Sequence, residues 1–255
     1  GHLREQVEAL LNENYPQVTI VEQPVRNGTG GAVACGMSVL GEVSREVVVT
    51  YGDVPMLTGE TLAALVKAHR EGGNACTVLT AVVPDPTGYG RIVRERGQVA
   101  RIIEHRDASD AERLIREINS GIYVFDGQVL REGLASLTTD NEQGELYLTD
   151  VLEYARKHDR NVGAYVTDDI WQTEGVNDRV QLARMNAEVN RRILERWMLD
   201  GVTVVDPATT WIEADVDLEA DVTILPNTQL LGATSVATGA VIGPDTTLRD
   251  VEVGE

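Results

Sequence analysis

The sequence is poor in positive charge, in cysteine and in aromatic side chains, and it contains no long hydrophobic run. Lys and Arg number 22 against 41 Asp and Glu, so the net charge of −19 argues against a surface for nucleic acid or anionic lipid. No apolar stretch approaches the roughly 20 residues that span a bilayer, so no membrane partner is expected. Cys35 and Cys76 lie far apart, which predicts free thiols and a cytoplasmic protein rather than a disulfide framework.

Apolar residues are plentiful enough for a sizeable core, at 42% of the chain. Short apolar runs alternate with helical patterns, and this order is typical of βαβ units with a mostly parallel sheet. A hairpin is expected around Gly97, which separates two short strand-like segments. The expected strands are Val18–Val21, Val47–Val49, Cys76–Val83, Ile92–Arg94, Val99–Glu104, Ile122–Phe125 and Val162–Val166. The sequence therefore predicts an α/β domain.

A lone carboxylate, Asp53, follows the buried strand expected at Val47–Val49. Pro55 disfavours helical backbone at Val54, so the chain is expected to turn there. Ligands of open α/β sheets bind at the carboxyl ends of strands, where a carboxylate can hold Mg²⁺ against a substrate phosphate. The alternative is that Asp53 only caps the turn by accepting hydrogen bonds from backbone N–H groups. This stretch alone leaves both interpretations open.

A glycine-rich turn at Asn27–Gly31 precedes a helical pattern over Ala32–Leu40. Backbone N–H groups at the start of such a helix can approach a nucleotide closely. Glycine clusters more often only form turns, so this signal is weak by itself.

The last part of the chain changes its period. A long helix is expected over about Asp178–Leu199, a length that can link two domains. After it an aliphatic residue recurs every six positions, and a second row stands four positions after the first and is mostly small or β-branched. The first row is Ile212, Leu218, Ile224, Leu230, Val236, Ile242 and Leu248. Hexapeptide spacing of this kind predicts a parallel β-helix with three short strands in each coil.

Several short motifs occur in a characteristic order. They are Gln23 with Gly28-Thr29-Gly30, Tyr51-Gly52-Asp53-Val54-Pro55, Asp85-Pro86-Thr87-Gly88-Tyr89-Gly90-Arg91, Ile103-Glu104-His105, Glu117-Ile118-Asn119-Ser120-Gly121, Gln143-Gly144-Glu145, Leu148-Thr149-Asp150 and Glu174-Gly175-Val176-Asn177. With the hexad tail they resemble the bacterial bifunctional N-acetylglucosamine-1-phosphate uridylyltransferases and glucosamine-1-phosphate N-acetyltransferases, over essentially the whole chain. The resemblance implies a Rossmann-like nucleotidyltransferase domain at 1–176, a linking helix at 177–200 and the first coils of a left-handed β-helix acetyltransferase domain at 201–255.

The family resemblance implies that the phosphate of N-acetylglucosamine 1-phosphate attacks the α-phosphorus of UTP, giving UDP-N-acetylglucosamine and pyrophosphate. Such chemistry needs positioning and charge neutralisation more than covalent help. By resemblance, Asp53 and Asn177 are the catalytic pair that binds Mg²⁺, although Asn177 alone suggests only the N-cap of the long helix. Gln23 and the backbone at Gly28 and Thr29 are implied to hold uracil.

The sugar site is implied in the same way. Gly90 would offer its backbone to the sugar, and Glu104 and Asn119 would hydrogen-bond its hydroxyl or acetamido groups. Tyr51 and Gly52 belong to the implied substrate site, although Tyr51 is equally compatible with simple packing. Without the resemblance, Glu104 is an edge-strand carboxylate and Asn119 a turn former.

Two departures from the family pattern are apparent. Gly31 stands where the family usually has His, and no segment matches the family's first strand with its Gly-x-Gly-Thr-Arg phosphate loop and lysine. Lysine occurs only at Lys67 and Lys157, both in other contexts. We therefore expect these 255 residues by themselves to have weak uridylyltransferase activity. Most of the acetyltransferase half, which would use acetyl-CoA and glucosamine 1-phosphate, is also expected to be absent.

Two alternatives stay open beside this interpretation. One is a sugar-1-phosphate nucleotidylyltransferase for another base or sugar. The other is a non-catalytic fragment that forms trimers through its long helix and hexads. The resemblance itself implies a homotrimer that supplies precursors of peptidoglycan and lipopolysaccharide.

Overall fold

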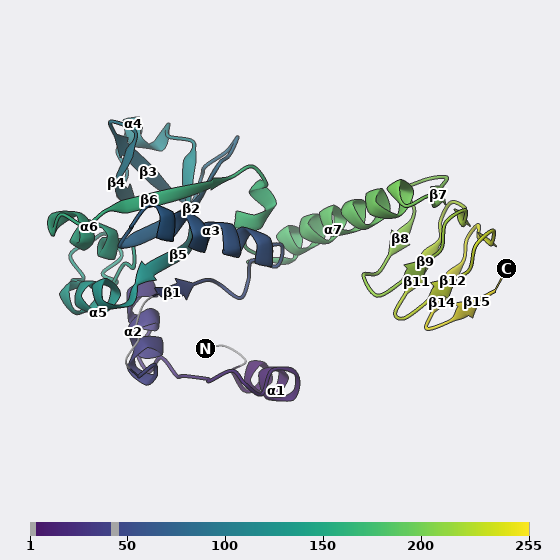
Figure 1. Ribbon diagram of the computed structural model, residues 1–255, viewed down its shortest axis with the longest axis horizontal. Helices are drawn as coiled ribbons and strands as arrows, with labels where there is room; N and C mark the ends of the chain where they lie inside the picture. The colour runs from purple at the N-terminus through teal and green to yellow at the C-terminus, as the bar shows by residue number, and fades with distance from the viewer. Residues whose placement is uncertain (1–3, 42–45, 255) are drawn as a thin grey trace. The chain divides into compact units, whose positions relative to one another are not determined.

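The computed structural model describes residues 4–41 and 46–254, and it divides into two compact units, Gly1–Glu174 and Gly175–Glu255 (Figure 1). The first unit is an α/β domain built on one sheet, and the second joins a long helix to short parallel strands. Of the helices in the described residues, none combines the length and the apolar character needed to cross a membrane.

The sheet of the first unit has six strands, in the order β4-β3-β5-β2-β6 with β1 beside β5. The hairpin expected around Gly97 is confirmed, because β3 and β4 pair antiparallel on either side of it. The strand expected at Val18–Val21 is wrong, since these residues belong to no strand of the described chain. The strands are β1 (Glu46–Val49), β2 (Cys76–Val82), β3 (Gly90–Glu95), β4 (Gln98–Ile103), β5 (Glu117–Asp126) and β6 (Val162–Thr167).

The Rossmann-like α/β class is confirmed, but the sheet is mixed instead of mostly parallel. Among the described strands of this sheet only β2 and β6 pair in parallel, while β1–β5, β2–β5, β3–β4 and β3–β5 are antiparallel. Since β1 and β2 both run opposite to β5, they run in the same direction, as a βαβ unit predicts. They are not neighbours because β5, which follows much later in the chain, lies between them.

Helices cover both faces of this sheet. On one face Leu65 of α3 packs with Leu79 of β2 and Val124 of β5. On the other face Leu130 of α5 and Leu152 of α6 pack with strand residues in a larger core. The helices of the unit are α1 (Arg4–Asn14), α2 (Thr29–Val39), α3 (Gly59–Glu71), α4 (Asp110–Arg113), α5 (Gly127–Ser136), α6 (Asp150–Lys157) and the 3-10 turn η1 (Ile170–Thr173).

The second unit begins with α7 (Arg179–Leu199), whose N-cap is Asp178, not the neighbouring Asn177. The Asp178 side chain accepts a hydrogen bond from the Gln181 backbone N–H at 2.8 Å. The strands that follow are β7 (Thr203–Val204), β8 (Trp211–Ile212), β9 (Asp217–Leu218), β10 (Thr223–Ile224), β11 (Gln229–Leu231), β12 (Ser235–Val236), β13 (Val241–Ile242), β14 (Thr247–Arg249) and β15 (Glu252–Val253).

These short strands form three parallel sheets, β13-β10-β7, β14-β11-β8 and β15-β12-β9. Ile212 pairs with Leu230 and Leu218 with Val236, so most paired residues are three hexads apart, as expected for three strands per coil. Six of the seven first-row aliphatics are buried, and so are Val216, Val222, Thr228, Thr234 and Ala240 of the second row. The expected β-helix start is thus confirmed from its inward-facing rows.

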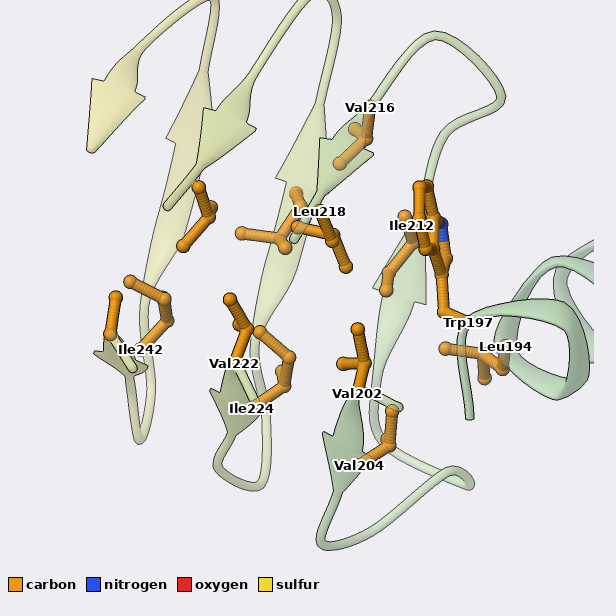
Figure 2. Packing of buried hydrophobic residues seen from close by; sticks show 13 residues of the cluster. Leu194, Trp197, Val202, Val204, Ile212, Val216, Leu218, Val222, Ile224 and Ile242 are labelled. Atoms are coloured by element: carbon orange, nitrogen blue, oxygen red, sulfur yellow. The ribbon is translucent and has the colours of Figure 1, made fainter. Parts of the chain in front are cut away.

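Helix α7 closes the first coil of this core. Leu194 and Trp197 pack against Val202, Val204 and Ile212 in the cluster that Figure 2 shows from close by. Asn190 fastens the same helix to β8: its side chain donates to the Thr210 carbonyl at 2.9 Å and accepts from the Ile212 N–H at 3.0 Å. These contacts make α7 part of the folded second unit.

Candidate functional site

A break in the ladder of β5 creates the candidate site. Along one edge of β5, the end of β1 pairs up to Tyr123 and the start of β3 pairs at Asn119. Opposite them β2 shifts register, so Ser120–Ile122 face a single residue, Leu79. Side chains hold this bulge: Ser120 donates to the Leu79 carbonyl at 2.7 Å and accepts from the Ile122 N–H at 3.1 Å. Bulges of this kind redirect side chains and often lie beside active sites.

Tyr51 lies directly on the bulge. Gly121 has φ of +81°, and a Cβ built on it would collide with the Tyr51 ring, whose Cζ would be only 3.1 Å away. Burial of the ring, and then the carboxylates of Glu104 and Asp53, raise the pKa of the Tyr51 phenol. Tyr51 is 36% exposed, so it both packs on the bulge and presents an edge to solvent.

Asn119 connects the bulge to the hairpin. Its Oδ1 accepts from the Gly121 N–H at 3.0 Å and from the Tyr123 hydroxyl at 2.8 Å. Its amide nitrogen has no hydrogen-bond partner within the described residues, and it would lie 3.5 Å from a Cβ at Gly90. Glycine at position 90 therefore avoids the close contacts that a Cβ would make with Asn119 and Ile102, each at 3.3 Å.

Glu104 follows the last residue of β4, and its carboxylate is partly buried near other acidic side chains. Burial, and then the carboxylates of Asp107 and Asp150, raise the pKa of Glu104. Burial also raises the pKa of Asp150, at the start of α6. A carboxylate that is desolvated among other carboxylates gains free energy from a hydrogen-bond donor such as a hydroxyl group.

The glycine-rich turn is bound to the segment at Glu145–Leu148. The Leu146 N–H donates to the Asn27 carbonyl at 2.7 Å, and the Gly30 N–H donates to the Leu146 carbonyl at 2.9 Å. The Leu148 N–H donates to Thr29 Oγ1 at 3.2 Å. Gly28 has φ of +98°, and a Cβ there would approach the Leu146 carbonyl oxygen to 2.6 Å. Glycine is therefore required at position 28 by both backbone conformation and contact.

Gln23 is held by this turn. Its side-chain nitrogen donates to Asn27 Oδ1 at 3.1 Å and to the Gly28 carbonyl at 3.2 Å. The side-chain carbonyl of Gln23 has no protein partner in the part of the chain that the structure describes. A Cβ at Gly31 would collide with Asn27, so the unusual glycine at this position accommodates the Asn27 side chain.

Asp53 and Gly52 lie on the exposed turn that follows β1. Among the hydrogen bonds and ion pairs of the described residues, none involves Asp53, whose side chain is exposed. No group of three or more His, Cys, Asp or Glu in that part of the chain is arranged to hold a metal ion. Mg²⁺ usually takes one or two protein ligands together with substrate phosphates, which an unpartnered carboxylate fits. Asn177 belongs to the second unit.

The structure therefore brings together Tyr51, Gly90, Glu104 and Asn119 from four separate segments. It adds Gly121, Tyr123, Asp107, Asp150 and Tyr147, which sequence reasoning did not assign to the site. Gly121 and Asp150 lie in motifs that the sequence singled out, so their spacing was a usable signal. Tyr123 has the pattern of an ordinary core strand residue, and only its hydrogen bond to Asn119 reveals its position.

Comparison with known proteins extends these observations. Bifunctional GlmU proteins from Cutibacterium acnes, Paenarthrobacter aurescens and Pseudarthrobacter chlorophenolicus are 59%, 58% and 59% identical over all of this chain. The chain spans only 62%, 52% and 52% of their lengths. A structure from Bacillus anthracis, assigned as a glucose-1-phosphate thymidylyltransferase, shares the fold, with a TM-score of 0.54 and 19% identity, over 72% of this chain and 71% of its own.

The sequence model of the nucleotidyl transferase family matches residues 2–186 of this chain, which are most of the first unit and the start of α7. The match includes the bulge, the hairpin and the glycine-rich turn, which together form the candidate site. The chain therefore belongs to the nucleotidyl transferase family.

Proposed function

We propose that the first unit carries the uridylyltransferase site of a protein that makes UDP-N-acetylglucosamine. A phosphate oxygen of N-acetylglucosamine 1-phosphate attacks the α-phosphorus of UTP and forms a new P–O bond. The bond between the α-phosphorus and the bridging oxygen breaks, and pyrophosphate leaves. No covalent intermediate with the protein is required, so binding and orientation by the chain are the main contributions.

One observation carries this proposal: the Tyr51 ring lies against the β5 bulge, where Asn119 accepts from the Gly121 N–H, and the Glu104 carboxylate is close enough to act on the Tyr51 phenol. The Asn119 amide nitrogen offers a donor, the Glu104 carboxylate offers acceptors, and the Tyr51 ring offers an apolar surface. This combination suits a sugar with hydroxyl and acetamido groups, since such a ligand needs polar partners and an apolar contact surface.

The glycine-rich turn supplies the proposed uracil site. The side-chain carbonyl of Gln23 can accept a hydrogen bond from the uracil N3–H, because its amide nitrogen is already engaged by the turn. The backbone at Gly28 and Thr29 is fixed by its hydrogen bonds to the 146–148 segment. Preorganised groups of this kind lose little entropy when a base binds.

Asp53 is proposed to bind Mg²⁺, which would neutralise phosphate charge of both substrates. On a chain with net charge −19, a bound cation also offsets repulsion of the polyanionic nucleotide. Asp53 contributes an exposed carboxylate, an oxygen ligand of the kind that Mg²⁺ prefers.

The wider assignment is proposed by analogy with the relatives. It comprises a uridylyltransferase domain at 1–176, a linking helix at 177–200 and the first coils of an acetyltransferase domain at 201–255. The remainder of that domain would use acetyl-CoA and glucosamine 1-phosphate. The assembly would be a cytoplasmic homotrimer that supplies cell-wall precursors.

The test is release of pyrophosphate from UTP and N-acetylglucosamine 1-phosphate with Mg²⁺. It is run on the 255-residue chain and on the same chain preceded by the N-terminal segment of the Cutibacterium acnes relative. We expect activity in the extended protein, loss on chelation with EDTA and recovery with Mg²⁺. Replacing UTP by dTTP, GTP or ATP tests the base, and equal or faster turnover with one of them would overturn the choice of UTP.

Site variants test the residues. Glu104→Gln and Asn119→Ala should each raise the KM for the sugar phosphate by about tenfold or more, because each removes a hydrogen bond to a charged or buried group. Glu95→Gln is the matched control, since Glu95 is an exposed carboxylate at the other end of the same hairpin. Unchanged KM in both site variants would exclude this sugar site.

A further inference from the structure

Arg91 is the one fully buried arginine of the described chain, with an exposed fraction of 1%; no carboxylate of the described residues makes a direct ion pair with it, and the Asp85 carboxylate acts on it only at longer range. Its guanidinium donates to the Tyr89 carbonyl and, at 3.2 Å, to Nδ1 of His105. Its Nε has no partner within the described residues. Burial lowers the pKa of this guanidinium. Because a buried cation without a direct carboxylate contact reduces stability, the presence of Arg91 calls for a compensating role.

Gly90 and Arg91 are neighbours on β3, so position 90 and the Arg91 side chain belong to opposite faces of the sheet. Gly90 pairs with Asn119 and faces the candidate sugar site, whereas Arg91 pairs with Ile103 and Ile118 behind it. Successive strand residues point to opposite faces, so Arg91 cannot reach the ligand. Any effect of Arg91 on the sugar must therefore pass through another residue.

His105 provides that connection. The pairing of β3 with β4 ends at Arg91 and Ile103, so Glu104 is the first residue beyond the ladder. Within the described residues, the backbone hydrogen bond that holds Glu104 runs from the Asp107 N–H to its carbonyl at 3.1 Å. Arg91 adds a restraint at the next residue, His105, on the face opposite to the one where the Glu104 carboxylate lies near Tyr51.

We propose that Arg91 is a positioning residue. It donates a hydrogen bond to the His105 ring on the far face of the sheet, and it thereby orients Glu104 toward a sugar 1-phosphate. A guanidinium only donates hydrogen bonds, so Nδ1 of His105 must accept, and the ring carries its proton on Nε2. The hydrogen bond to His105 rests on the geometry above, whereas its consequence for sugar binding rests on the proposed function.

Hydrogen–deuterium exchange of the ligand-free protein tests this hydrogen bond without any substrate. In Arg91→Met and in His105→Phe, the Asp107 amide, which donates to the Glu104 carbonyl at 3.1 Å, should exchange about tenfold faster or more, because local opening becomes less costly. His105→Asn should restore slow exchange, since Asn Oδ1 can accept near the position of Nδ1. His105→Phe keeps the test valid if Arg91→Met does not fold.

Arg101→Met is the matched control. Arg101 lies on β4 and is exposed, with an ion pair to Glu112, so its loss should leave exchange of the Asp107 amide unchanged. Unchanged exchange in Arg91→Met and His105→Phe would overturn the inference. Faster exchange spread over the whole β3–β4 hairpin would also overturn it, since Arg91 would then only stabilise the hairpin. Failure of His105→Asn to restore slow exchange would exclude the acceptor role.

Calorimetric titration separates this inference from the proposed function. With N-acetylglucosamine 1-phosphate as the probe, the Kd should rise about tenfold in His105→Phe, while the Kd for UTP stays unchanged. Equal weakening of both ligands would overturn the link to the sugar. If the unmodified chain and its extended form bind no sugar phosphate, the proposed function fails, and the exchange data still decide whether Arg91 positions Glu104.

Discussion

Replacing Gly121 by alanine tests the geometry of the bulge, because two separable effects follow from one added methyl group. Gly121 has φ of +81°, a conformation that costs an L-residue about 1 kcal/mol or more. The new Cβ also needs the space that the Tyr51 ring fills. Gly97 has nearly the same φ, +83°, with no atom within 4 Å of a built Cβ. Gly97→Ala therefore measures the backbone cost alone.

The cost of moving Tyr51 can be worked out from its burial. The side chain is 36% exposed, so about two thirds of it lies in contact with the protein. An aromatic side chain buries roughly 150–250 Å², and about 25 cal/mol per Å² gives up to about 3 kcal/mol for releasing this part. Because the ring can retain some contacts, we expect Gly121→Ala to cost about 2–4 kcal/mol in total and Gly97→Ala about 1 kcal/mol.

Native-state hydrogen exchange of the β2 and β5 amides measures this free energy in the first unit alone. Tyr51→Ala completes a double-mutant cycle: in that background, Gly121→Ala should cost no more than Gly97→Ala. If Gly121→Ala lowers the free energy of unfolding as much in the Tyr51→Ala background as in the unmodified protein, the proposed collision with the Tyr51 ring is refuted. Gly121→Ala should also weaken binding of the sugar phosphate, since the ring it displaces lines the proposed site.

Three other perturbations have defined outcomes. Burial and neighbouring carboxylates raise the pKa of Glu104, so the affinity of the protein for the sugar phosphate should fall as pH drops toward that raised pKa. Titrations between pH 8 and pH 5 check this, with a smaller fall in Glu104→Gln, where only the ligand phosphate, with its second pKa of about 6, still contributes. Hydrogen bonds from Arg191 and Arg192 lower the pKa of Glu188 to about 2. The stability that this pairing gives α7 should therefore be lost as pH falls from about 5 toward 2. We expect a loss of about 1 kcal/mol, because Arg191 is 57% exposed and solvent screens its charge. Thermal unfolding should show a smaller acid loss in Glu188→Gln, and equal losses would contradict the pairing. Asn190→Ala leaves a buried carbonyl and a buried N–H unpaired and should destabilise the second unit by roughly 3 kcal/mol in urea unfolding, whereas substitution of the exposed Asn186 should have little effect.

The residue types of the candidate site could be predicted from motifs, but their mutual arrangement could not. Asp53 and Glu104 follow strands, and Asn119 lies within β5 beside the turn-like Ser120-Gly121, so the sequence marks all three places by turn residues. Their convergence depends on β5 meeting β1 and β3 along one edge, a set of pairings between segments far apart in the chain. Gly121 illustrates the difference: its motif is visible in the sequence, whereas the reason for glycine is the ring of Tyr51.

Sequence alone determined the β-helix coils, because their pattern is local and repeated. Each hexad provides one inward aliphatic, and the same spacing returns the chain to a parallel neighbour such as Leu230 beside Ile212. The order and direction of strands in the large sheet were decided only by the tertiary structure. An apolar run buries equally well beside a parallel or an antiparallel neighbour, so its composition does not specify which strand lies next to it. The insertion of β5 between β1 and β2 is set by how the whole domain buries its core, and that same insertion creates the site.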